Sequence, residues 1–117
     1  MSCEVFNETD FGMIEGSQQT INLNIFNILG ESFSGLAINS VTWRMSVYGE
    51  TECVVEKDSI SNSRDFEIEE NLIQITILSN ETEGLHGKFT HQIVITDLHG
   101  SNFVVDLGKI SIKPRIK

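Results

Sequence analysis

The chain has 117 residues and a formal net charge of −9, from 17 acidic side chains against 8 lysines and arginines. This length forms one domain with a single core, and clusters rich in Ile, Val and Phe exclude a disordered chain. Contacts with nucleic-acid phosphates need clustered basic side chains, so the negative charge argues against a nucleic-acid partner.

The cysteines and the N-terminus bear on the compartment. Cys3 and Cys53 are the two cysteines, and we expect free thiols in a reducing compartment because the chain shows no secretory segment. No apolar stretch approaches the length that spans a bilayer, so no membrane partner is expected.

The first residues do not show a clear period. We expect residues 1–17 to form an N-terminal arm or a short first strand, ahead of a single domain over residues 18–117. Four large apolar side chains lie there among acidic residues: Phe6, Phe11, Met13 and Ile14. An edge strand docked on its own domain should alternate, because one face is buried. We therefore hypothesise that part of this arm contacts a neighbouring subunit through these side chains.

Alternating apolar residues predict strands along the rest of the chain. The expected strands cover residues 18–26, 41–47, 53–55, 66–68, 72–78, 89–97 and 103–112. The third is expected to fade into the charged residues 56–58, and residues 27–40 are expected to be loop. No apolar period of 3.6 persists, so the prediction is an all-β, antiparallel immunoglobulin-like β-sandwich of about seven strands with little or no helix.

The last two strands form the longest predicted hairpin. Asp97 opens its tight turn, and Gly100 takes a position of positive φ without steric cost. Phe103, Val105 and Leu107 share one parity, which shifts by one at Gly108, as at a β-bulge. Inward parity predicts a core that includes Trp43, Ile75, Phe89, Ile93, Phe103 and Ile110.

No set of residues amounts to a catalytic, metal or cofactor site, so the chain is not expected to be an enzyme. His86 and His99 fall at opposite ends of a predicted strand and His91 lies between them, so the three histidines do not converge on one metal. Cys53 lies among valines, where a structural thiol is the default reading. The carboxylates between Glu50 and Glu70 have no glycine-containing calcium loop, so a solvated acidic face is expected there.

The C-terminal half resembles a recurring pattern. It runs from Ile73–Ile77 through Thr82, the Gly87-Lys88-Phe89 strand start and the Asp97–Gly100 hairpin to Gly108 before the last strand. This pattern resembles small immunoglobulin-like domains of tailed-bacteriophage structural proteins, and is similar to the N-terminal domain of phage baseplate upper proteins. Phe89 stands where those domains usually have tyrosine. The resemblance covers about residues 68–114 and implies a structural role.

The resemblance implies a virion structural protein, a tail or baseplate component or a head decoration, assembled in the host cytoplasm. Its partners would be other virion proteins or copies of itself, contacted through edge strands and the N-terminal arm. One alternative is a carbohydrate-binding module for host adsorption, which needs exposed aromatic side chains. Another is an acidic DNA mimic, which would use the charge but would not need the hairpin.

Overall fold

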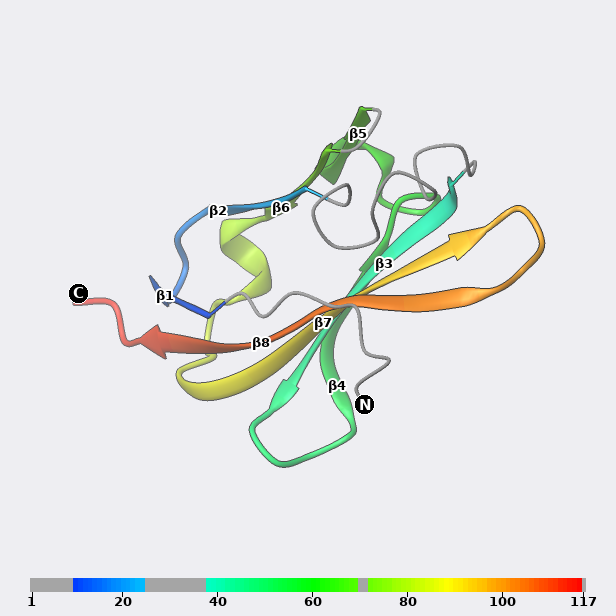
Figure 1. Ribbon diagram of the computed structural model, residues 1–117. Coiled ribbons are helices and arrows are strands. Elements are labelled where there is room, and N and C mark those ends of the chain that lie inside the picture. Colours follow the sequence, from blue (N-terminus) through cyan, green and yellow to red (C-terminus); the bar gives the residue numbers. More distant parts are fainter. Residues whose placement is uncertain (1–9, 25–37, 70–71, 117) are drawn as a thin grey trace.

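The computed structural model describes residues 10–24, 38–69 and 72–116. Two sheets pack face to face, with strand orders β1-β8-β7-β3-β4 and β2-β6-β5 (Figure 1). The strands of the first sheet are β1 (Phe11–Ile14), β8 (Asn102–Lys113), β7 (Gly87–Asp97), β3 (Ile38–Val47) and β4 (Cys53–Asp58). Those of the second are β2 (Gln19–Asn24), β6 (Leu72–Ile77) and β5 (Phe66–Glu69).

This order is that of an immunoglobulin-like sandwich. In the immunoglobulin lettering β8, β7, β3 and β4 are G, F, C and C′, while β2, β6 and β5 are B, E and D. The predicted fold class is therefore confirmed. The described residues contain no α-helix, and only two short 3-10 turns occur among them, η1 (Ser63–Asp65) and η2 (Ser79–Glu81).

The β7–β8 hairpin lies at the centre of the larger sheet, between β1 and β3 (Figure 1). At its tip, Asp97 Oδ1 accepts hydrogen bonds from the backbone N–H groups of His99 and Ser101, each at 2.9 Å. Gly100 has a φ of 84°, a conformation that costs glycine little. Both residues thus play the roles that the sequence predicts.

The core lies between the two sheets and is made of the inward positions of nearly every strand. Trp43, Ile75, Phe89, Ile93 and Ile110 are buried, as predicted. Phe103 is only half-buried, because it lies one residue from the start of β8, near the hairpin tip. The alternation along the strands therefore identifies most of the core.

The predicted bulge exists but lies elsewhere. The register of β7 with β8 shifts between Ile93 and Val94, which pair with Asp106 and Val104. Val105 and Asp106 are consecutive and both buried, so they form the bulge. The shift turns Leu107 outward, where it is 38% exposed, and corrects the prediction that placed the shift at Gly108.

Two strands extend beyond their predicted ends. β3 begins at Ile38 rather than Val41, and β4 continues through Asp58 rather than fading after Val55. The charged Lys57 hid the alternation, because it occupies an inward position opposite Trp43 and is 2% exposed. A charged residue at an inward position interrupts the apolar alternation, so the sequence pattern suggests that the strand has ended.

Part of the predicted N-terminal segment, residues 1–17, contains a short strand; its residues 1–9 lie outside the described residues. Phe11–Ile14 forms β1, which pairs with β8 in parallel, so the sandwich is not wholly antiparallel. Met13 is buried in the core and Phe11 packs against it. Alternation was not visible in sequence because the strand has four residues and Gly12 lacks a side chain.

Candidate interaction surface

The four residues predicted to contact a partner do not form one site. Phe11 and Met13 belong to the domain's own core, which corrects the hypothesis for these two side chains. Ile14 points outward and is 52% exposed. Phe6 lies outside the described residues.

Hydrogen bonds hold the segment around β1 to the rest of the domain. The Gly16 N–H donates to Thr82 Oγ1 at 3.0 Å, and the Gly84 N–H donates to Glu15 Oε2 at 2.7 Å. The Lys109 N–H donates to Asp10 Oδ1 at 2.8 Å. Residues 10–16 are therefore part of the sandwich, in contrast to a detachable arm.

A buried polar cluster links the two sheets. The Lys57 ammonium group donates to Asp65 Oδ2 at 2.8 Å, to Glu81 Oε1 at 2.8 Å and to the Thr76 carbonyl at 2.9 Å. Glu81 also accepts a hydrogen bond from the Leu78 N–H, which closes the η2 turn. Asp65 is thus not part of a solvated acidic face, which corrects that expectation for this residue.

The three partners of Lys57 lie in η1, β6 and η2. Each bond therefore joins β4 to the smaller sheet or to a turn next to it. The charges are paired and hydrogen-bonded, as burial of an ion requires. We assign this cluster to the architecture and not to a ligand site. Sequence reasoning missed it because a charged Lys57 does not fit the apolar alternation of an inward strand position.

The histidines do not converge. His91 is buried and its Nδ1 accepts a hydrogen bond from Trp43 Nε1 at 3.1 Å, while His86 and His99 are exposed. Within residues 10–24, 38–69 and 72–116, no group of three or more His, Cys, Asp or Glu side chains is placed to hold a metal ion. Cys53 is a free thiol, as expected, and is exposed at the start of β4, while Cys3 lies outside the described residues.

The outer face of the larger sheet, turned away from β2, β6 and β5, presents three cross-strand rows. The register aligns Ser46, Thr90 and Lys109 in one row, Arg44, Gln92 and Leu107 in the next, and Thr42, Val94 and Val104 in the third. Val104 is 48% exposed and Leu107 38%. This face therefore combines exposed aliphatic side chains with polar and basic ones.

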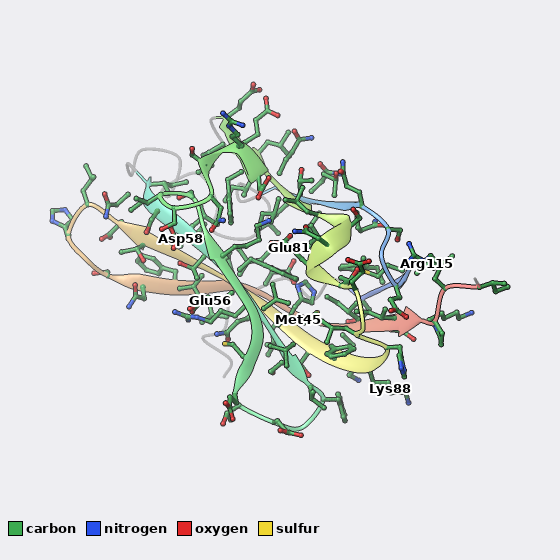
Figure 2. The ribbon with its side chains drawn as sticks, turned by 180° about the vertical axis from the view of Figure 1, so that it is seen from behind. Met45, Glu56, Asp58, Glu81, Lys88 and Arg115 are labelled. Atoms are coloured by element: carbon green, nitrogen blue, oxygen red, sulfur yellow. The ribbon has the colours of Figure 1, made fainter. Side chains whose placement is uncertain are left out.

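A hollow of about 480 Å³ lies on this face, beside β1. We call it the lysine hollow; Asp10, Phe11, Gly12, Tyr48, Lys88, Lys109, Ile110 and Ser111 line it. Tyr48 is 54% exposed, and the Lys109 ammonium group lies 5.9 Å from the centre of its ring. Lys88 points outward from the start of β7 (Figure 2).

Gly12 helps to keep the hollow open. A Cβ atom added there would meet only the Ser111 carbonyl oxygen, at 3.6 Å, an ordinary contact. The backbone would accept a side chain, and glycine leaves the space above β1 and β8 unfilled.

One carboxylate outside the lysine hollow, that of Asp58, has a shifted pKa. The pKa of Asp58 is lowered from its ordinary value because its carboxylate accepts a hydrogen bond from the Ser61 N–H, and a further one from Ile60. These bonds close the turn after β4. Asp58 therefore has a structural role in this turn.

Comparisons with known proteins identify no family for this chain. No family model and no curated protein matches this chain. Within the part of the chain that the structure describes, no helix is long and apolar enough to cross a membrane.

Three solved structures have a similar architecture. A fibronectin(III)-like module of CbhA from Clostridium thermocellum has 10% identity over 95% of this chain and 92% of its own, with a TM-score of 0.49. CopC from Methylosinus trichosporium OB3b has 8% identity over 97% of this chain and 89% of its own, with a TM-score of 0.47. A 2,6-sialyltransferase from Photobacterium sp. JT-ISH-224 has 11% identity and a TM-score of 0.48, over 97% of this chain but 19% of the enzyme.

Proposed function

We propose that this chain is a structural subunit of a tailed-bacteriophage particle, in the tail, the baseplate or the head surface, and acts through protein–protein contacts. The observation that supports a contact role is the outer face of the larger sheet. Ile14, Val104 and Leu107 are exposed on it, and Tyr48 stands at its edge. Exposed aliphatic and aromatic side chains set among polar ones are typical of protein interfaces.

The virion context rests on the resemblance of residues 68–114. Two features of that pattern have structural roles here: the Asp97–Gly100 turn closes the central hairpin, and Phe89 is in the core. Phe89 lies two residues before His91 on the F strand, the place of the tyrosine in a tyrosine corner. Without its hydroxyl, this chain stabilises that corner by packing.

The test is the location of the chain in purified particles. Mass spectrometry of particles after stringent washing should detect the chain at a fixed ratio to the major capsid protein, and gold-labelled antibody should mark one part of the particle. Absence of the chain from washed particles, with the protein present in the infected cell, would overturn the proposal.

A second function, sugar binding for host adsorption, is favoured by one observation. Tyr48 offers an exposed aromatic ring beside a hollow that also holds the Ser111 hydroxyl and two ammonium groups. Titration with a panel of neutral and acidic sugars, followed by the NMR signals of the Tyr48 ring, tests it. Saturable shifts that Tyr48→Ala abolishes would support it, and a flat titration would exclude it for that panel.

A further inference from the structure

The floor of the lysine hollow is one cross-strand row of the larger sheet. Ser111 on β8 pairs with Gly12 on β1 and with Lys88 on β7, and all three residues are exposed on the outer face. Gly12 has no side chain and Ser111 has a short one, so the row lies lower than its neighbours. The hollow of about 480 Å³ has the size of a small-molecule site, for which about 300–1,000 Å³ is usual.

The charges that line the hollow sum to a positive value on a protein whose net charge is −9. Two ammonium groups, those of Lys88 and Lys109, face one carboxylate, that of Asp10. Asp10 Oδ1 already accepts a hydrogen bond from the Lys109 backbone N–H at 2.8 Å. Within the described residues no ion pair engages either ammonium group, whereas Arg44 and Lys57 have acidic partners. The hollow therefore favours an anionic group.

The other polar and aromatic groups of the hollow match a sugar. The Tyr48 ring is 54% exposed and offers an apolar surface at the side of the hollow. The Ser111 hydroxyl both donates and accepts, and the carboxylate of Asp10 accepts, so hydroxyl groups of a ligand find both kinds of partner. The Lys109 ammonium group lies 5.9 Å from the centre of the Tyr48 ring, a weak contact at an exposed position, so an anion can draw it away from the ring.

We propose that the lysine hollow binds an acidic sugar, one that carries a carboxylate on its ring. The carboxylate pairs with Lys88 and Lys109, the hydroxyl groups bond to Ser111 and Asp10, and the apolar face of the ring packs on Tyr48. The negative net charge opposes such a ligand only at long range, because physiological salt screens charges beyond about 8 Å. This inference rests on the second proposed function, sugar binding, and names the class of sugar.

An NMR titration of the full chain at constant ionic strength tests the proposal, with the backbone amide signals of Gly12, Lys88 and Ser111 as the readout. Glucuronate against glucose and galacturonate against galactose are matched pairs that differ only in the carboxylate. Each acid should give saturable shifts at these amides and bind at least about tenfold more tightly than its neutral partner, because a charge-assisted hydrogen bond is stronger than a neutral one.

Three variants locate the binding. Lys88→Gln should weaken glucuronate several-fold, and Arg64→Gln is its matched control, with the same loss of charge at an exposed residue of η1 outside the hollow. Gly12→Leu should abolish binding of every sugar, because the new side chain enters the hollow while the backbone accepts it. Matching circular dichroism and melting curves would show that these variants fold.

The sugars separate failure of this inference from failure of the functions proposed above. Neutral sugars that bind as tightly as the acids would keep sugar binding and overturn the acidic class. Acetate that shifts the same amides with the affinity of glucuronate would reduce the hollow to a contact for any carboxylate and overturn the inference. Affinity for glucuronate that Lys88→Gln and Gly12→Leu leave unchanged would also overturn it. A flat titration with all four sugars would remove sugar binding with it, while the structural role is decided separately, by the presence of the chain in purified particles.

Discussion

The inner face of the larger sheet is constrained by packing against the second sheet, whereas the outer face is exposed to solvent. On the inner face, Trp43, Phe89 and Ile110 are buried against the second sheet, so each is constrained by packing. On the outer face, Val104, Leu107 and Lys109 are exposed, and folding does not require their chemistry. The inner face therefore explains the fold, while a function has to be sought on the outer face.

The strongest test of the inner face is Trp43→Ala. The side chain is fully buried and donates to His91, so we expect a loss of about 3–5 kcal/mol in the free energy of unfolding. Urea unfolding followed by circular dichroism measures it. Trp43→Phe, which keeps a ring but loses the donor, should cost less; a loss below about 1 kcal/mol for the alanine variant would contradict the description of this face.

The next largest effect on stability is expected at Lys57, the buried lysine of the inner face. Lys57→Met should destabilise the domain by about 3 kcal/mol, because it leaves Asp65, Glu81 and the Thr76 carbonyl without their shared donor. Adding Asp65→Asn and Glu81→Gln should recover part of this loss, since it removes the two unpaired charges. A single variant as stable as the wild type would show that the cluster does not link the sheets energetically.

Truncation tests whether β1 contributes to the stability of the domain. Deleting residues 2–16 should destabilise the domain by at least about 2 kcal/mol, because it removes the buried Met13 and the contact of Gly16 with Thr82. Deleting residues 2–9 is the comparison, because it leaves β1 and the contact of Gly16 with Thr82 in place. Equal melting curves for the two truncations would mean that β1 adds nothing to the fold.

A smaller effect belongs to a turn at the end of β4. The folded-state pKa of Asp58 is lowered, so its contribution to stability is present above the pKa of the unfolded chain, about 4, and is lost as pH falls through the lower folded value. Asp58→Asn should therefore reduce stability at pH 7 and reduce the acid sensitivity below about pH 4. Unfolding measured across pH checks this, and parallel pH profiles for variant and wild type would contradict it.

Much of the inner face was predictable from sequence because burial imposes alternation. Ile73, Ile75 and Ile77 of β6 are all buried, and the Asp97–Gly100 turn has the chemistry of its sequence. Predictions failed where a residue broke the rule for a local reason. Lys57 is charged but inward, and the Val105–Asp106 bulge reverses the parity of Leu107.

The outer face could not be derived in the same way. The lysine hollow combines side chains from β1, β7, β8 and the end of β3, which no local pattern brings together. The residues of the hollow come together because β1 pairs in parallel with β8. Parallel strands are not joined by a tight turn, so the sequence carries no hairpin signal for this pairing. Of the four apolar residues predicted to contact a partner, Phe11 and Met13 belong to the core.

The most direct test of the account is the incorporation of an outer-face variant into particles. Val104→Glu with Leu107→Glu should leave the free energy of unfolding within about 1 kcal/mol of the wild type, because both side chains are already exposed. Ile68→Glu is the matched control, since Ile68 is also 38% exposed but lies on the smaller sheet. We predict that the outer-face variant folds but is lost from purified particles, while the control is retained. Incorporation of both variants at the wild-type ratio would contradict the claim that the outer face is the assembly surface.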